Sequence, residues 1–391
     1  MKNAFDLTLE EPLFKRGAFR LRTVDVVFLM FITTFAVVAR AGFFPQVSGD
    51  YTNFLSDWFD AIKNAGGIFG IGLDIGDYTP PYLYILALLT YLPISSLASI
   101  KLVSCIFDFI LAFTALKTVF HLTKKSTYAI AAYTAVLFCP TVVLNGAAWA
   151  QCDAIFTAFL LLSFYAVLKN RPLQCCIWFG IAFSFKLQAI FFAPIFLYLW
   201  LRGKVKLRHL FAIPAVFVAS VIPAWLAGRD FFDLLFIYFN QAGQYKNLSK
   251  NAPSIWSLLA DTQNSGASLF GVMLAGTVVL LFLYWLWNAH KSPSDDILLG
   301  AVLFLLLVIP FLLPHMHERY FFPADIFAIL FACKAPRKRF LIPLCTVTGS
   351  LLSYLPFLFG KKPVELTVAA LFILAAIVLT GKDLLETAPN K

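Results

Sequence analysis

Residues 297–314 read ILLGAVLFLLLVIPFLLP, 18 positions without a charged side chain, and the five residues that follow read HMHER. A helix of about 20 mostly apolar residues can cross the hydrocarbon layer of a membrane. Similar apolar runs occupy most of the chain. The sequence therefore predicts an all-α, polytopic membrane protein with about twelve spanning helices, at residues 24–44, 99–121, 127–145, 153–168, 172–186, 188–201, 208–226, 267–289, 296–314, 319–333, 338–358 and 365–381.

The composition excludes a soluble protein. Of the 391 residues, 60% are hydrophobic and 13% are charged, whereas soluble domains carry about 45–50% apolar and about 25% charged residues. Basic loops on the cytoplasmic side of a membrane protein explain the net charge of +10 better than nucleic-acid binding does. The seven cysteines lie within or beside apolar runs and lack the spacing of metal ligands.

The positions of Lys and Arg orient the chain in the membrane. One further apolar stretch, 80–97, either crosses the membrane or lies embedded in it. If it does not cross, the dense basic clusters at 124–125, 202–208 and 334–339 all lie on the cytoplasmic side, as the positive-inside rule requires. We therefore expect a re-entrant or in-plane helix at 80–97 and both termini in the cytoplasm. The single domain, 1–391, then has a cytoplasmic tail at 1–23 and two long outer loops, 45–98 and 228–266.

The first outer loop contains Gly49-Asp50-Tyr51 and, further on, Asp77-Tyr78-Thr79-Pro80-Pro81. Apolar residues at helical spacing over 51–64 predict an amphipathic helix at the membrane surface, with Asp57 and Asp60 on its polar face. Asp50 directly precedes this helix. It is therefore either the residue that caps the helix or an acid that is available for chemistry.

Three other turns on the same predicted side carry polar side chains. Their ordinary interpretations are an interface anchor for Trp149 and a snorkelling side chain for Lys186. Charged and titratable side chains between two apolar helices are costly, however, and mark functional sites. A metal site in HMHER is less favoured than anion binding, because residues two apart do not share a helix face. The polar residues of the three turns are Asn145, Trp149, Gln151 and Asp153; Lys186 and Gln188; and His315, His317, Glu318 and Arg319.

Two acids, Asp108 and Asp325, lie inside predicted spans rather than in turns. Polar side chains within spanning helices often hydrogen-bond to neighbouring helices. We expect these two residues either to support helix packing or to hold residues of the site in position.

These motifs, in this order, resemble the GT-C superfamily of integral membrane glycosyltransferases. The closest likeness is to bacterial relatives of the GPI-anchor mannosyltransferases and to the ER glucosyltransferases that extend lipid-linked oligosaccharide. The ER enzymes read roughly GD(F/Y), DYPP, FKQMA and HVHEK where this chain reads GDY at 49–51, DYTPP at 77–81, FKLQA at 185–189 and HMHER at 315–319. WAQCD at 149–153 resembles the WGQxD of the bacterial relatives, with Ala150 in place of Gly.

The resemblance implies an enzyme that transfers a sugar from a polyprenyl-phosphate donor at the non-cytoplasmic face, with Asp50 as general base. We expect a hexose such as mannose or glucose, and inversion by a single displacement. Phosphate chemistry assigns Lys186, His317 and Arg319 to the donor phosphate. The other expected substrate contacts are Asp77, Tyr78, Trp149, Gln151, Asp153, Gln188, His315 and Glu318.

We expect no obligatory cofactor or metal, although Asp50, Asp77 and Asp153 could hold a divalent ion. The expected partners are the lipid-linked donor, membrane lipid and a glycan, glycolipid or protein acceptor, with no nucleic acid. The compact loops favour a bacterial plasma membrane.

Two alternatives to the glycosyltransferase remain open. One is a transporter or flippase of lipid-linked sugar; transporters carry internal repeats and broken helices at the bilayer midplane, whereas here the polar clusters lie at one face. The other is a non-catalytic assembly subunit. The glycosyltransferase requires Asp50, Lys186 and Arg319 to meet around one pocket.

Overall fold

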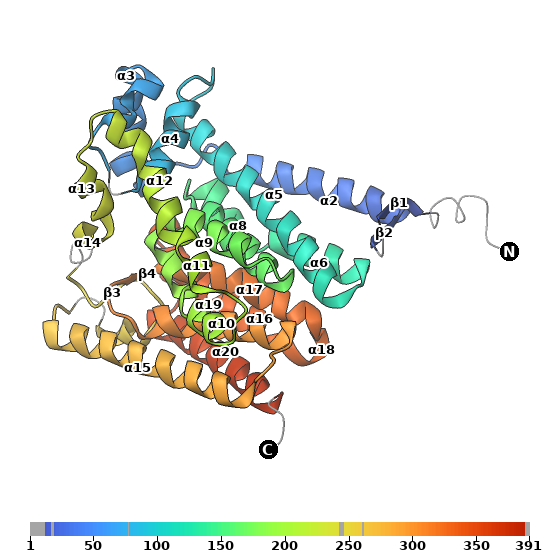
Figure 1. Cartoon of the computed structure of the whole chain (residues 1–391). Helices are drawn as coiled ribbons and strands as arrows, with labels where there is room; N and C mark the ends of the chain where they lie inside the picture. The colour runs from blue at the N-terminus through green and yellow to red at the C-terminus, as the bar shows by residue number, and fades with distance from the viewer. Residues whose placement is uncertain (1–11, 17–18, 77, 242–245, 260–261, 388–391) are drawn as a thin grey trace.

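The computed structural model describes residues 12–16, 19–76, 78–241, 246–259 and 262–387. Nearly all regular structure in these residues is helical, which confirms the all-α prediction (Figure 1). The elements are β1 Pro12–Arg16, β2 Phe19–Arg22, α2 Thr23–Ala41, η1 Tyr51–Leu55, α3 Ser56–Asn64, η2 Gly67–Gly72, α4 Pro80–Leu89, α5 Ser96–Thr123, α6 Ser126–Leu137, α7 Pro140–Val143, η3 Leu144–Ala148, α8 Asp153–Leu168, α9 Pro172–Phe185, η4 Leu187–Phe192, α10 Pro194–Leu201, α11 Leu207–Leu210, α12 Ala212–Leu226, α13 Phe231–Leu235, α14 Ile237–Gln241, β3 Ser249–Lys250, η5 Ile255–Leu259, α15 Ser265–Ala289, α16 Asp295–Leu312, β4 Met316–His317, η6 Glu318–Phe321, α17 Phe322–Lys334, α18 Pro336–Arg339, α19 Leu341–Phe359 and α20 Leu366–Glu386.

Each of the twelve predicted spans contains helix, but not every helix reaches spanning length. In the part of the chain that the structure describes, seven helices are long and apolar enough to cross a membrane, and the bent pair Ser126–Leu137 and Pro140–Ala148 would make an eighth. The helices α8, α9 and α17 and the segment Leu187–Leu201 are shorter. The polytopic architecture is therefore confirmed, whereas the count of twelve spans stays a prediction.

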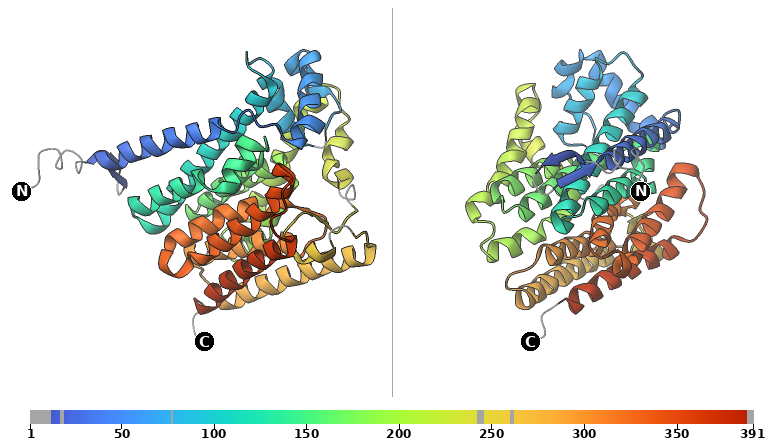
Figure 2. Two further views of the ribbon diagram at one scale, coloured as in Figure 1. Left: turned by 180° about the vertical axis from the view of Figure 1, so that it is seen from behind. Right: turned by 90° about the vertical axis from the view of Figure 1, so that its right-hand side faces the viewer.

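The helix α16, which holds the 297–314 run, lies in the interior of the bundle. Of the residues in its spanning stretch 83% are buried, against 11% for α2. It packs against α15, α17 and α20. A helix that is apolar on all sides must be surrounded by protein or lipid. Protein surrounds α16, whereas α2 lies at the edge of the bundle with most of its surface uncovered (Figure 2).

A cap of short elements formed by η1, α3, η2 and α4 covers one end of the bundle (Figure 1). The predicted amphipathic helix over 51–64 is present as η1 and α3, with Phe59 and Ile62 buried and Asp57 and Asp60 exposed. The helix α4 has ten residues, about 15 Å at 1.5 Å per residue, half the hydrocarbon thickness of a bilayer. Whether 80–97 crosses the membrane stays a prediction.

The second outer loop is joined to the first loop and to the HMHER segment. The guanidinium of Arg229 lies 2.6 Å from a carboxylate oxygen of Asp74. The strands β3 and β4 pair in parallel, which places Lys250 beside His317. The cap, the second outer loop and HMHER therefore form one end of the molecule.

The basic cluster 334–339 lies at the other end of the helices that flank HMHER. The guanidinium of Arg339 lies 2.7 Å from Asp296 at the start of α16 and 2.6 Å from Asp383 near the end of α20. HMHER instead connects the end of α16 to the start of α17. The charge-derived topology requires this separation, because it assigns the two clusters to opposite sides of the membrane.

The two acids within the bundle have partners there. The Nε of Arg40 lies 2.9 Å from Asp108. Asp325 accepts hydrogen bonds from the hydroxyls of Thr141 at 2.7 Å and Ser350 at 2.9 Å. These contacts join α5 to α2 and α17 to α7 and α19, in keeping with the expected packing roles.

Candidate active site

Asp50 does not cap the helix that follows it. Its backbone is helical (φ −67°, ψ −31°) and its side chain makes no capping hydrogen bond. Its Oδ2 accepts a hydrogen bond from Nε1 of Trp149 at 2.8 Å and another from Nε2 of Gln151. A guanidinium nitrogen of Arg319 lies 3.7 Å from the same oxygen. These three contacts all fall on Oδ2, so Oδ1 is the oxygen available to a substrate.

The corner 145–153 reaches Asp50 through a π-helical turn, η3, followed by a tight bend. Ala150 adopts a left-handed conformation with φ +66°, which glycine adopts without strain. The resembled motif has Gly at this position. Trp149 is fully buried and stacks on Phe357 with ring centroids 4.6 Å apart. The interface-anchor interpretation of Trp149 is therefore wrong.

Lys186 forms a buried ion pair instead of snorkelling to the membrane edge. It ends α9 in an extended conformation, and its Nζ lies 2.5 Å from Oδ1 of Asp153. The ammonium also lies 5.3 Å from the ring centroid of Tyr78. The other oxygen of Asp153 accepts a hydrogen bond from Asn145 at 2.7 Å. The carboxylate thus fixes the position of the lysine, which is needed because an unpaired buried charge is costly.

Arg319 lies between the two aspartates. Its Nε is 3.6 Å from Oδ2 of Asp153, and its NH1 is 3.7 Å from Oδ2 of Asp50. Its guanidinium carbon is 5.6 Å from the ring centroid of Trp149. One cation therefore connects the base candidate to the Lys186–Asp153 pair.

The surroundings shift both Glu318 and His317 toward their neutral forms. Burial raises the pKa of Glu318 to about 7 although Arg319 opposes the shift, and the charges of Asp50 and Asp153 add to it. Burial and the nearby charges of Arg319, Lys250 and Lys186 hold the pKa of His317 well below its usual value. His317 would therefore meet a phosphate as a neutral hydrogen-bond donor and not as a cation.

His315 hydrogen-bonds to Asn247 of the second outer loop and to Ser268 of α15. Its backbone has φ +64°. Nδ1 lies 2.7 Å from the carbonyl oxygen of Asn247, and Nε2 lies 3.0 Å from Oγ of Ser268. The ring lines a cavity, but both of its nitrogens are engaged, so any contact with substrate would replace one of these bonds.

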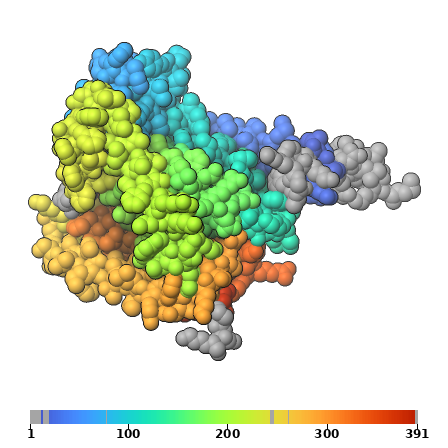
Figure 3. All heavy atoms as spheres, viewed as in Figure 1, coloured from blue at the N-terminus to red at the C-terminus, as the bar shows by residue number. Residues whose placement is uncertain are grey.

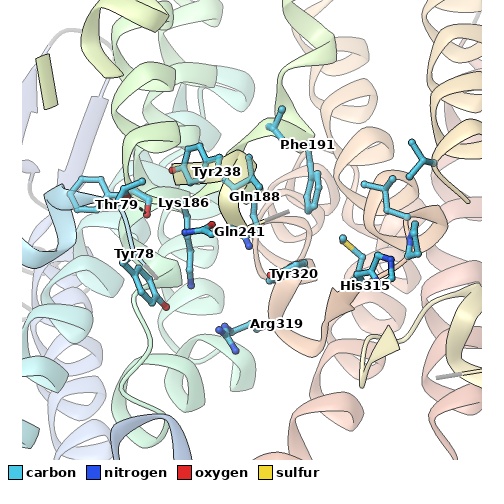
Figure 4. A pocket seen from close by; sticks show the side chains of 17 residues that line it. Tyr78, Thr79, Lys186, Gln188, Phe191, Tyr238, Gln241, His315, Arg319 and Tyr320 are labelled. Atoms are coloured by element: carbon cyan, nitrogen blue, oxygen red, sulfur yellow. Dashed lines mark hydrogen bonds between the residues drawn. The ribbon is translucent and has the colours of Figure 1, made fainter. Parts of the chain in front are cut away.

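Two cavities meet at Tyr78 and Arg319, which line both. The first, of about 450 Å³, has mainly apolar walls that include Phe185, Ile190 and Val272. Lys186 and Gln188 line it together with Arg319 (Figure 4). In the space-filling view a recess lies between the chain around α14 and α15, with the segment after α16 at its floor (Figure 3).

The second cavity, of about 370 Å³, contains the base candidate. Asp50, Gln151, His317 and Glu318 line it, with Lys250 and Asn251 from the second outer loop. Phe54, Trp58 and Phe357 supply aromatic walls. The two cavities thus differ in chemistry, one mainly apolar and one polar with an aromatic wall.

The structure brings together most of the residues that the sequence singled out. Asp50, Tyr78, Trp149, Gln151, Asp153, Lys186, His317, Glu318 and Arg319 surround the junction, Gln188 lines the first cavity and Asp77 lies outside the described residues. Asn145 was missed as a site residue, although its place at a polar corner was a signal. Phe357 was missed because it lies in an apolar run that resembles any other span.

Residues 77–310, more than half of the chain, match the model of Glycosyltransferase family 87. The chain belongs to this family. Among solved structures it is similar to ArnT from Cupriavidus metallidurans, whose crystal structure contains undecaprenyl phosphate; the TM-score is 0.57, the sequence identity is 11%, and the match covers 92% of this chain and 77% of ArnT. At this identity the likeness shows the fold alone. No curated protein matches the chain.

The GT-C resemblance is thus confirmed, and family membership makes the protein a glycosyltransferase rather than a transporter. The five GT-C-like motifs identified in the sequence extend beyond the matched region at both ends, to Asp50 and to Arg319.

Proposed function

We propose that this glycosyltransferase moves a sugar from a polyprenyl-phosphate donor to an acceptor hydroxyl at the non-cytoplasmic face of the membrane. The observation that carries the proposal is the meeting of Asp50, Lys186 and Arg319, from three distant segments, where two cavities join. A general base and phosphate-binding cations are the two requirements of this reaction.

The reaction is a single displacement at the anomeric carbon. Oδ1 of Asp50 takes the proton of the acceptor hydroxyl as its oxygen bonds to the anomeric carbon. The bond from that carbon to the phosphate oxygen breaks, and its electron pair leaves with the phosphate. Lys186 and Arg319 stabilise the second negative charge that the phosphate gains. In-line attack predicts inversion, and Asp50 then releases its proton to water.

The first cavity fits the lipid end of the donor. Its apolar walls suit a polyprenyl chain, and Lys186 and Gln188 mark where its phosphate would lie. ArnT, which shares the fold, was crystallised with undecaprenyl phosphate. We therefore place the donor phosphate between Lys186 and Arg319, and the transferred sugar on the Asp50 side of the junction.

The charges at the junction favour a monophosphate donor. Lys186 and Arg319 are balanced by Asp50 and Asp153, and Glu318, with its pKa raised to about 7, is only partly ionised near pH 7. Lys250 lines the adjoining cavity. Its charge can offset the one negative charge that a monophosphate-linked sugar adds, whereas a pyrophosphate adds two.

We expect no obligatory metal. Arg319 contacts both Asp50 and Asp153, two of the three acids that could have held a divalent ion. Within the ranges that the structure describes, no three His, Cys, Asp or Glu side chains gather as metal ligands. Asp77, the third acid, lies outside those ranges. Transfer measured with EDTA tests this expectation.

The finer identity of the substrates follows the sequence analysis. The transferred sugar is a hexose such as mannose or glucose, and the site faces outward from a bacterial plasma membrane with both termini in the cytoplasm. A mannosyltransferase of envelope polysaccharide biosynthesis fits these expectations.

Purified protein in lipid nanodiscs tests the proposal. Decaprenyl-phosphate mannose and decaprenyl-phosphate glucose are each supplied with membrane glycans from a deletion strain, and NMR of the product reads the anomeric configuration. We expect sugar transfer with inversion from one of these donors. Movement of the intact lipid-linked sugar across vesicles without any transfer would instead support a flippase.

A further inference from the structure

The wall of the second cavity is unusually aromatic for a site built around a carboxylate. Phe54, Trp58, Tyr78 and Phe357 line it together with Asp50. Phe357 stacks on Trp149, which holds Asp50 by a hydrogen bond. Trp58 has no such role, because the general base does not contact it in the described structure. Its place on the cavity wall therefore needs another explanation.

Trp58 is held in place by contacts with the polypeptide behind it. Gly76 has φ +70°, and a Cβ at that residue would lie 2.7 Å from Cε2 of the indole and 2.9 Å from Cδ2. Only glycine therefore allows the backbone to approach the ring so closely. The ring of Tyr78 packs edge-on against the indole, with centroids 5.6 Å apart. The indole is thus a supported wall and not a mobile surface side chain.

The position of Trp58 relative to the base is fixed by a short chain of contacts. The hydroxyl of Tyr78 donates to Oε1 of Gln151 at 3.1 Å, and the amide of Gln151 donates to Oδ2 of Asp50. A ligand that lies against the indole would therefore be held at a set distance from Asp50.

The indole N–H of Trp58 is not engaged within the described part of the chain. The corresponding groups of Trp149 and Trp256 are used, by Asp50 at 2.8 Å and by the carbonyl of Leu312 at 2.8 Å. Trp58 makes no hydrogen bond with the residues that the structure describes. An aromatic ring with a free polar edge combines an apolar face and a donor.

We propose that Trp58 is the binding platform for a sugar ring of the acceptor, so that the attacked hydroxyl belongs to a glycan. This proposal rests on the proposed function and names the acceptor class for the same site. A sugar ring presents an apolar face of C–H groups and a rim of hydroxyls. The indole matches the face, while Gln151 and Asn251 line the same cavity with polar groups that match the rim. A peptide acceptor would instead need partners for its backbone groups.

Transfer and donor hydrolysis, measured side by side, test the proposal. Wild-type protein, Trp58→Leu and Trp58→Phe receive decaprenyl-phosphate mannose or glucose, with mannobiose, cellobiose or a Ser/Thr-rich peptide as acceptor probe. We expect transfer to a disaccharide. Trp58→Leu should raise the acceptor KM about tenfold, corresponding to about 1.4 kcal/mol, and Trp58→Phe should raise it less. Slow hydrolysis of the donor by water should stay within about twofold of wild type, because no sugar acceptor takes part.

Two further variants separate binding from general damage. Gly76→Ala should raise the acceptor KM as Trp58→Leu does, because a Cβ displaces the indole. Trp225→Leu, on α12 and half exposed, should leave both rates unchanged. Transfer to the peptide alone, or an acceptor KM unchanged by Trp58→Leu, would overturn the proposal and leave the proposed function intact. Absence of both hydrolysis and transfer in wild type would overturn both.

Discussion

The substitution Asp50→Asn separates the chemistry from donor binding. The carboxamide oxygen of Asn can accept the hydrogen bonds that Trp149 and Gln151 now donate to Oδ2. Its NH₂ group then replaces Oδ1 and cannot accept a proton. We therefore expect an intact fold and a base that no longer functions.

The size of the effect follows from the role of the group. General-base catalysis contributes about 10²- to 10⁴-fold, or about 3–5 kcal/mol in barrier height at 1.36 kcal/mol per tenfold. Transfer by Asp50→Asn should fall by this factor. Donor affinity should be unchanged or slightly higher, because the variant removes the negative charge 3.7 Å from Arg319 and leaves Lys186 in place.

Single-turnover transfer from radiolabelled donor measures the chemical step, and equilibrium binding of the same donor in nanodiscs measures affinity. Asp60→Asn, which changes an exposed acid on α3 of the same outer loop, is the matched control and should behave as wild type. Transfer by Asp50→Asn within tenfold of wild type would refute the assignment of the base. A loss of donor binding as large as the loss of transfer would place Asp50 in donor binding instead.

Three further predictions concern the residues around the junction. Lys186→Met should raise the donor KM more than tenfold and should lower Tm, since it removes the cation 2.5 Å from Asp153. The loss of stability should stay below the about 3–5 kcal/mol of a buried charge left wholly unpaired, because Arg319 remains 3.6 Å from this carboxylate. Lys186→Arg should recover part of the affinity, and an unchanged donor KM in Lys186→Met would contradict the phosphate role. The pKa of Glu318 is raised to about 7 in the folded protein, so the folded state binds the proton more tightly than the unfolded state does. Stability should therefore fall as pH rises from about 4.5 to 7. Thermal melts of Glu318→Gln should show a weaker fall, and equal dependence of Tm on pH in the variant and the wild type would refute this. Ala150→Gly should change the free energy of unfolding by less than about 1 kcal/mol, because relief of left-handed strain offsets the loss of a buried methyl group. Ala150→Val should destabilise the protein by more than about 2 kcal/mol. Equal melting temperatures for the two variants would contradict the left-handed backbone conformation of this residue.

The sequence was sufficient to locate the helices because the signal is local. A run such as 297–314 has no charged side chain, and no structure other than a buried or spanning helix accommodates it. The number of spans could not be read in the same way. The helices α8 and α9 are interrupted early by polar turns, and whether such short helices cross a membrane depends on their neighbours.

The roles of single side chains were harder to predict than their positions. Trp149 and Lys186 each had an ordinary interpretation at the membrane edge, and both are buried. The partner of Lys186, Asp153, lies 33 positions away and on another helix. The engagement of both nitrogens of His315 depends on Asn247 and Ser268, which no motif marked.

The sequence by itself determined that the chain is a bundle of apolar helices with its costly polar groups at one end. The free energy of burying a charged or an apolar side chain depends mainly on that side chain, so the order of residues is enough to show it. Only the tertiary structure decided which polar groups share a cavity and which oxygen of Asp50 stays available. Those outcomes depend on how helices distant in sequence pack against one another, and the packing brings Arg319 within 4 Å of Asp50 from the other end of the chain.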